Sequence, residues 1–270
     1  QLYVAGVEVN WLGFDKDYSR QRLALPTYPF QRQRYWQDIS EVRLSVNPQN
    51  SHPLLGNQVN LANSKTIHFE SKLSQNSPAF LQDHRIFDQA ILPASAYVEM
   101  ALAAGKKVNP TGNFGLKDIV LHQAMILPEN EEKTVQLILT AQENQDYCFE
   151  IFSLQEGSQT WVNHASGMLV LQVDAVKSRD KLNLKSLERE TIKDIKTVYN
   201  TYQKRGINYG ESFRIIEKIY NLSDTEKKQV IVQIKPSEAI KKEFNSYQVH
   251  PIILDACFQA VGATFSDQQL

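Results

Sequence analysis

One histidine and one aspartate, far apart in this sequence, have the chemistry of a base and an acid. His84 lies in the stretch LQDHRIFDQAILP, and neutral imidazole, with an ordinary pKa of about 6.5, accepts a proton near neutral pH. Asp255 lies in residues 251–265, a segment that is apolar nearly all round, and Gln259 follows it by one helical turn. Burial in such a segment raises the pKa of a carboxyl group, so Asp255 has the setting of a general acid.

Each of these residues also has a purely structural interpretation. A lone histidine ahead of a helix is more often a structural hydrogen-bonding residue. An aspartate near a helix start can simply interact with the positive end of the helix dipole. Neither residue decides the chemistry alone, so the elements that position them have to be considered.

Hydrophobic periodicity predicts those elements. Alternation of apolar and polar residues predicts strands at 67–73, 134–141, 147–154, 161–171 and 229–235. Helical spacing predicts helices at 94–108, 191–205 and 251–265, the second of them ending at Gly206. The last helix must be buried on every side, as if a sheet wraps it. Strands followed by a helix, repeated once, indicate an α+β fold of two sheet-and-helix units.

The chain divides further by composition. Residues 1–50, with the aromatic and basic stretch LPTYPFQRQRYW at 25–36, are predicted to be a linker that straps onto a neighbouring domain. Stacking on single-stranded nucleic acid is a weaker alternative because the net charge is near zero. Residues 174–190 are charged and poorly periodic, which is typical of a linker. They separate the two expected units, 51–173 and 191–270.

Composition excludes several classes of protein. A formal net charge of -1 and 22% charged residues give no sign of nucleic-acid binding, and no run approaches the ~20 apolar residues of a membrane span. Cys148 and Cys257 lie in apolar contexts, so we expect buried, reduced thiols of a cytoplasmic protein. The six histidines have no metal-ligand spacing, so no metal site is expected.

Short motifs occur in a fixed order along the chain. They are His52-Pro53-Leu54-Leu55-Gly56; His84 with Pro93 in a His-xxx-Gly-xxxx-Pro spacing; Trp161-Val162-Asn163-His164-Ala165-Ser166-Gly167; Tyr209-Gly210-Glu211-Ser212-Phe213; and His250-Pro251 followed by Asp255 and Gln259. Each is weak alone, but the ordered set resembles the dehydratase domains of modular polyketide synthases. The stretch at 25–36 is similar to the segment that ends the preceding acyltransferase.

The resemblance implies a double hotdog, in which two antiparallel sheets are each wrapped around a long buried helix. It implies removal of water from a 3-hydroxyacyl thioester, giving the 2-enoyl thioester during polyketide chain extension. The acyl chain would be carried on the phosphopantetheine of an acyl carrier protein, and the domain itself would need no cofactor. Expected partners are that carrier, the neighbouring acyltransferase and ketoreductase domains, and a second copy of the chain in a homodimer.

The resemblance also assigns roles. His84 would remove the C2 proton and Asp255 would protonate the C3 hydroxyl, while Gln259 would orient Asp255 or hold the leaving water. Tyr209 would donate a hydrogen bond and Gly210 would leave room for the acyl chain. The remaining expected substrate contacts are Asp88, Pro93 and Phe213.

The chain departs from the family pattern at three positions and in its extent. Asp88 stands where the His-xxx-Gly-xxxx-Pro motif has glycine. The backbone N–H of this position is expected to face the thioester carbonyl. A carboxylate pointing inward there would oppose a developing oxyanion, so we expect the Asp88 side chain to point to solvent. Ala94 replaces a usual glycine and Glu211 a proline. Strands that cover the last helix are also missing, so the second hotdog is expected to be incomplete or to continue beyond Leu270.

Two alternative functions remain at this stage. The same scaffold could shift a double bond or cyclise the enoyl product. An inactive structural domain of the synthase is the other alternative, but the presence of both His84 and Asp255 argues against it.

Overall fold

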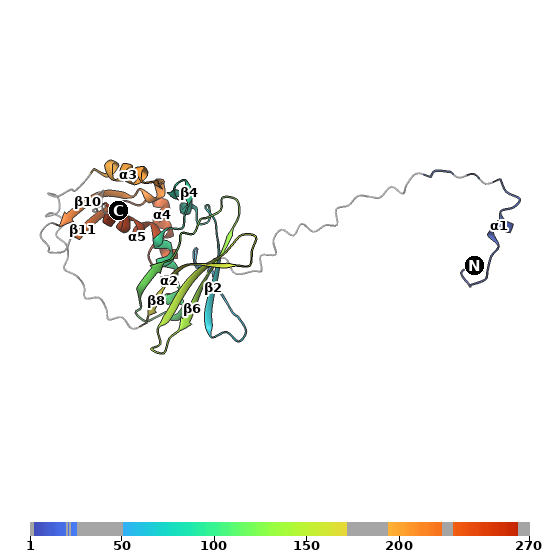
Figure 1. The fold of residues 1–270 in the computed structure, drawn as a ribbon, viewed down its shortest axis with the longest axis horizontal. Coiled ribbons are helices and arrows are strands. Elements are labelled where there is room, and N and C mark those ends of the chain that lie inside the picture. Colours follow the sequence, from blue (N-terminus) through green and yellow to red (C-terminus); the bar gives the residue numbers. More distant parts are fainter. Residues whose placement is uncertain are drawn as a thin grey trace. The chain divides into compact units, whose positions relative to one another are not determined.

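The alternating pattern of the first half folds into one six-stranded antiparallel sheet (Figure 1). Its order is β1 (Asn57–Val59), β2 (Thr66–Leu73), β6 (Lys133–Ala141), β7 (Tyr147–Leu154), β8 (Trp161–Val170) and β5 (Gly115–Leu121). In β6, Val135, Leu137 and Leu139 are fully buried while the residues between them are half-buried. This period of two gives the sheet one core face, as the sequence predicted.

The computed structural model describes residues 3–19, 21, 23–25, 51–171, 194–222 and 229–263. The chain separates into two units, Gln1–Ser45 and Val46–Leu270. In the first unit, the short helix α1 (Trp11–Phe14) is capped by the side chain of Asn10. Most of the stretch at 25–36 and the whole predicted linker at 174–190 lie outside the described residues.

Helix α2 (Ala94–Val108) has the bounds predicted from the sequence and packs on β5 and β8. Ala96, Ala101 and Ala104 are fully buried, so small side chains let the helix come close to the sheet. A Cβ at Gly105 would lie 2.8 Å from side-chain atoms of Leu169 and of Phe114, so this position has no room for one. The helix is therefore the central core element of the first half.

The second half of the larger unit has its own helix and sheet. The elements are α3 (Ile195–Lys204), β9 (Ile207–Tyr209), η4 (Glu211–Phe213), β10 (Ile216–Leu222), β11 (Gln229–Ile234), α4 (Glu238–Glu243), η5 (Phe244–Ser246) and α5 (Pro251–Gly262). Strands β10 and β11 pair antiparallel, and α5 packs on β11 and on α2. The two central helices therefore meet inside one unit.

Three sequence predictions need correction. Helix α3 begins at Ile195 because the Asp194 side chain accepts the N–H of Thr197 and caps it. Helix α5 is not buried on every side, because Phe258 is 42% and Val261 49% exposed. Cys257 on the same helix is exposed and Cys148 is only half-buried, so the expectation of two buried thiols is wrong.

A small three-stranded sheet joins the two halves and was not predicted. It is formed by β4 (Gln89–Ala90), β3 (His84–Ile86) and β9, in that order, with His84 opposite Tyr209. The 3-10 helix η2 (Ala79–Asp83) leads directly into β3. The His84 motif and the Tyr209 motif are thus held side by side by backbone pairing.

No described helix is long and apolar enough to cross a membrane.

Gly56 gives a stability test of the fold. It has φ +71, and a Cβ there would lie 1.9 Å from the carbonyl oxygen of Glu70. We expect Gly56→Ala to lower the free energy of unfolding by about 2–4 kcal/mol, combining backbone strain with overpacking. Gly157→Ala is the matched control, because Gly157 has φ +67 but open space around it, and should cost about 1 kcal/mol. Equal losses in denaturant titrations would show that the contact with Glu70 is unimportant.

Candidate active site

His84 begins strand β3 and is held by a backbone contact. The residue is 7% exposed, and its Nδ1 lies 2.8 Å from the carbonyl oxygen of Ile91. A carbonyl only accepts hydrogen bonds, so the neutral ring carries its proton on Nδ1 and leaves Nε2 as the basic nitrogen. The ring packs against Tyr209 at 5.6 Å and Phe213 at 5.3 Å between centroids. Its orientation is therefore fixed from both halves of the domain.

Asp255 lies in the second turn of α5 and is 4% exposed. Burial raises the pKa of its carboxyl group, while the charge of His84 and a hydrogen bond from Gln259 act in the opposite direction. The expectation of a buried carboxyl with a raised pKa is confirmed. Both candidates lie beside Phe213, whose ring is 5.3 Å from the His84 ring between centroids and whose carbonyl oxygen accepts from Gln259, the residue that also donates to Asp255.

Gln259 links the acid to the rest of the site. Its Nε2 donates to Asp255 Oδ2 at 2.9 Å and to the carbonyl oxygen of Phe213 at 3.1 Å. The residue is 2% exposed, and within the described part of the chain its Oε1 has no hydrogen-bond partner. The amide thus orients the Asp255 carboxyl, as expected, and presents one unused acceptor.

Tyrosines surround the acid from α3 and β9. Tyr202 donates its hydroxyl to the carbonyl oxygen of Gln259, and Tyr199 donates to that of Phe213 at 3.5 Å. Burial, together with the negative charge of Asp255, raises the pKa of Tyr199 and of Tyr202 to about 12. The same two causes raise the pKa of Tyr209 further. All these phenols therefore stay protonated and can act only as neutral donors or acceptors near neutral pH.

Gly210 lies against Asp83, which the sequence did not predict. A Cβ at this position would lie 2.4 Å from the carboxyl carbon of Asp83, and the Gly210 N–H donates to the Asp83 carbonyl at 2.6 Å. The Asp83 carboxylate also accepts the N–H of Ser212 at 2.9 Å. The missing side chain thus makes room for Asp83, which holds η4 in place. Sequence reasoning missed Asp83, although it directly precedes His84.

Asp88 lies in the tight turn between β3 and β4. Phe87 and Asp88 have φ of 48 and 64, so the turn uses two left-handed residues. The Asp88 side chain is exposed and accepts a hydrogen bond from Asn208 Nδ2 at 3.2 Å. The expectation that it points to solvent is confirmed. Pro93 is buried and directly precedes α2.

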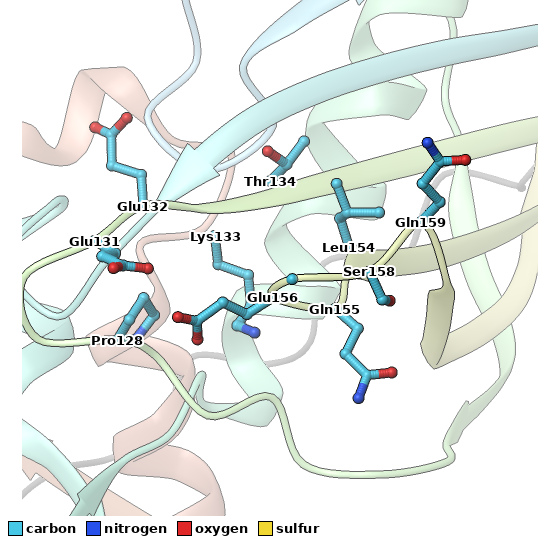
Figure 2. A pocket seen from close by; sticks show the side chains of 11 residues that line it. Pro128, Glu131, Glu132, Lys133, Thr134, Leu154, Gln155, Glu156, Ser158 and Gln159 are labelled. Atoms are coloured by element: carbon cyan, nitrogen blue, oxygen red, sulfur yellow. The ribbon is translucent and has the colours of Figure 1, made fainter.

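A separate pocket of about 400 Å³ lies at the start of β6 and the turn between β7 and β8 (Figure 2). Its lining includes Glu131, Glu132, Lys133 and Glu156 but neither member of the acid–base pair. It therefore does not contain the chemistry described above. Among the described residues, no group of three or more histidine, cysteine, aspartate or glutamate side chains is arranged to hold a metal ion.

Comparison with known proteins identifies the family. A family model described as polyketide synthase dehydratase domain matches residues 52–154, and one described as polyketide synthase dehydratase N-terminal domain matches residues 184–269. The solved dehydratase domain from the CurF module of curacin polyketide synthase is 34% identical, with a TM-score of 0.71, over 79% of this chain and 77% of that one. The chain belongs to the polyketide synthase dehydratase domains.

Further relatives of this dehydratase domain add detail. The CurK dehydratase is 34% identical with a TM-score of 0.70, over 81% of this chain and 76% of that one. It was solved as two inactive mutants, with a histidine replaced by phenylalanine or an aspartate replaced by asparagine. Polyketide synthase PksM of Bacillus subtilis is 31% identical over 96% of this chain, but the chain spans only 6% of that protein.

Family membership confirms the double hotdog and the dehydratase function in polyketide chain extension. It does not favour the isomerase, cyclase or purely structural alternatives. The six-stranded sheet with α2 is the first hotdog, and β10, β11 and α5 belong to the second. His84 and Asp255 come from different hotdogs, so the acid–base site lies between them.

The buried acid has a cost in stability that depends on pH. Burial raises the folded-state pKa of Asp255 above its ordinary value of 3.8, so the folded domain loses stability as the pH rises from that value through the raised pKa. Asparagine does not ionise. We therefore expect Asp255→Asn and the wild type to have similar melting temperatures near pH 4, with the variant increasingly more stable at higher pH.

Asp194→Asn is the control for this comparison. Asp194 is an exposed helix cap, and asparagine caps a helix as well as aspartate does. Its melting temperature should follow that of the wild type at every pH. A difference between Asp255→Asn and the wild type that does not change with pH would contradict the raised pKa.

Proposed function

We propose that this dehydratase domain removes water from a 3-hydroxyacyl thioester carried on the phosphopantetheine of an acyl carrier protein, with His84 as base and Asp255 as acid. The observation that carries the proposal is that these two buried groups, one from each hotdog, both lie beside Phe213. The His84 ring lies 5.3 Å from the Phe213 ring between centroids, and Gln259, which donates to Asp255 Oδ2, also donates to the Phe213 carbonyl oxygen. Elimination requires a base at C2 and an acid at the oxygen on C3, so the two groups must face adjacent carbons.

The proposed step balances as follows. His84 Nε2 takes the C2 proton, and the electrons of that C–H bond form the C2–C3 double bond. The C3–O bond breaks as Asp255 gives its proton to the hydroxyl group, and water leaves. His84 becomes positive and Asp255 negative, and the attraction between them favours both changes together. Transfer of a proton from the His84 imidazolium back to the Asp255 carboxylate restores the starting state.

The neighbouring side chains support this chemistry. Gln259 Oε1, buried and unpartnered within the described residues, is proposed to accept a hydrogen bond from the C3 hydroxyl or from the leaving water. Tyr209, kept protonated by burial, is proposed as a donor to the substrate. The backbone N–H of Asp88 is proposed to face the thioester carbonyl, with Pro93 and Phe213 as further substrate contacts. Gly210 is proposed to leave room for the acyl chain.

The CurK relative gives independent support for two required groups. In that dehydratase, replacement of one histidine or one aspartate gives an inactive mutant. His84 and Asp255 are the buried histidine and aspartate that interact with each other in this domain. We propose that they fill the corresponding roles.

The proposed setting is a multidomain synthase. The curated relatives are polyketide synthases of which this chain spans only a small part. We therefore propose neighbouring acyltransferase and ketoreductase domains, and a second synthase copy in a homodimer. The phosphopantetheine would belong to the acyl carrier protein, and the domain would use no cofactor of its own. Both cysteines are free thiols, which fits a reducing cytoplasm.

His84→Ala and Asp255→Asn should each abolish most of the enoyl product. Loss of one general base or acid costs typically 10²–10⁴-fold, so each turnover number should fall by about that factor. Asp88→Gly should keep activity equal or higher, because it retains the backbone N–H and removes an exposed charge. Mass spectrometry of the carrier-bound acyl group measures the loss of one water directly.

The same assay distinguishes the alternative functions. A product with a shifted double bond or a ring indicates an isomerase or cyclase. If the wild type loses no water with any acyl chain length or C3 configuration tested, the domain is structural and the proposed function is wrong.

A further inference from the structure

A second buried carboxylate, outside the acid–base pair, connects the two hotdogs. Glu99 lies on α2 and is fully buried. Its Oε1 accepts the backbone N–H of Gln248 and its Oε2 accepts that of Val249, both at 2.7 Å. Both oxygens of a side chain from the first hotdog are thus used to hold a backbone segment of the second.

His52 completes this cluster. Its Nδ1 accepts the backbone N–H groups of Leu54 at 3.2 Å and Leu55 at 3.0 Å. The proton of the neutral ring is therefore on Nε2, which donates to Glu99 Oε1 at 3.0 Å. Three donors, contributed by His52, Gln248 and Val249, offset the cost of burying the carboxylate.

The position of this cluster relates it to the active site. Gln248 and Val249 directly precede His250, the cap of α5, and that helix carries Asp255 about one turn further on. Helix α2, which carries Glu99, begins three residues after Ile91. The carbonyl oxygen of Ile91 accepts a hydrogen bond from His84 Nδ1. Glu99 therefore joins the element anchored beside the base to the element that carries the acid.

We infer that Glu99 is a positioning residue for dehydration: its carboxylate fixes the start of α5 against α2 and so sets the separation of Asp255 from His84. The inference rests on the proposed function. Glu99 acts through the backbone of residues 248–249 and is not assigned any contact with substrate.

Apolar packing alone would not fix this separation. The start of α5 also contacts an aromatic cluster, in which the His250 ring lies 4.5 Å from Tyr247 and 5.3 Å from Phe80 between centroids. Such contacts are not directional, and they tolerate small sliding motions. Hydrogen bonds from two successive N–H groups to one carboxylate define both distance and direction. A misplacement of about 1 Å can cost about 10²-fold in rate, so this difference is enough to matter.

Glu99→Gln in the whole domain tests the inference. Glutamine has one acceptor oxygen, and its NH₂ group opposes the N–H of either Gln248 or Val249. We expect kcat to fall about 10²-fold while KM stays within about threefold. Hydrogen exchange of the Gln248 and Val249 amides should rise at least about tenfold, because their acceptor is lost.

Titration of Asp255 gives a readout that does not depend on turnover. Carbon-13 NMR of the Asp255 carboxyl, assigned with Asp255→Asn, should show its pKa moving down towards the ordinary 3.8 as α5 shifts and water enters. The groups whose charges interact with Asp255 are His84, Tyr199, Tyr202, Tyr209 and Cys257. None of them is changed by the substitution, so a shift reports movement or solvation of the acid.

Glu150→Gln is the matched control. Glu150 on β7 is half-buried and accepts a hydrogen bond from Asn163 at 3.2 Å within the first sheet. The same chemical change there should leave turnover, exchange at residues 248–249 and the Asp255 titration unaltered. Glu99→Asp, which keeps the charge and both acceptors, should recover part of kcat. If Glu99→Gln does not fold, His52→Gln replaces the ring that donates to Glu99 and accepts the Leu54 and Leu55 N–H groups, while the bonds from Gln248 and Val249 to Glu99 stay in place. It should give a smaller change in the same direction.

The outcomes separate the two proposals. The positioning role would be overturned if Glu99→Gln left both the hydrogen exchange at residues 248–249 and the Asp255 pKa unchanged. It would also be overturned if Glu99→Gln and Glu150→Gln changed kcat by the same factor. A wild type that does not dehydrate overturns the proposed function instead. Exchange and titration would then still decide whether Glu99 positions Asp255.

Discussion

The burial of Asp255 is the condition on which this site depends, because exclusion of water raises the pKa of its carboxyl group. The apolar residues of α5 provide that exclusion, since Ile252 and Ala256 are fully buried beside it. Gln259 and the charge of His84 both favour the ionised form, and burial outweighs them. Burial favours the protonated carboxyl group before the reaction. Gln259 and the charge of His84 favour the carboxylate that remains once the proton has been given up.

Dividing base and acid between two hotdogs makes the connections between the halves part of the chemistry. The polar connections that cross between them include three made to backbone groups: backbone pairing of β3 with β9, the Asp83 carboxylate on the Ser212 N–H, and the Glu99 carboxylate on residues 248–249. All three consist of directional hydrogen bonds to backbone groups. Helices α2 and α5 also contact one another across the halves, and the directional bonds set the register.

The sequence was informative where a pattern is long and local. Helix α2 and strand β7 have the predicted bounds, because each carries a sustained period that packing does not override. Strands β3 and β9 have three residues each, too few to show a period, and they form only because the halves meet. The contact that excludes a side chain at Gly210 was not predicted for the same reason, since it comes from Asp83, more than a hundred residues earlier. Glu99 carried no sequence signal beyond being the one acidic residue of α2.

The departure at Asp88 is best understood from its backbone. The turn after β3 needs left-handed conformations at two successive residues, and aspartate adopts this region more readily than most residues other than glycine. Phe87, with φ 48 and a ring that is 76% exposed, is the more costly of the two. Because the Asp88 carboxylate is exposed and bound to Asn208, water screens its charge from the buried pair. Replacing glycine here therefore changes the cost of forming the hairpin, while the backbone N–H and the acid–base pair are retained.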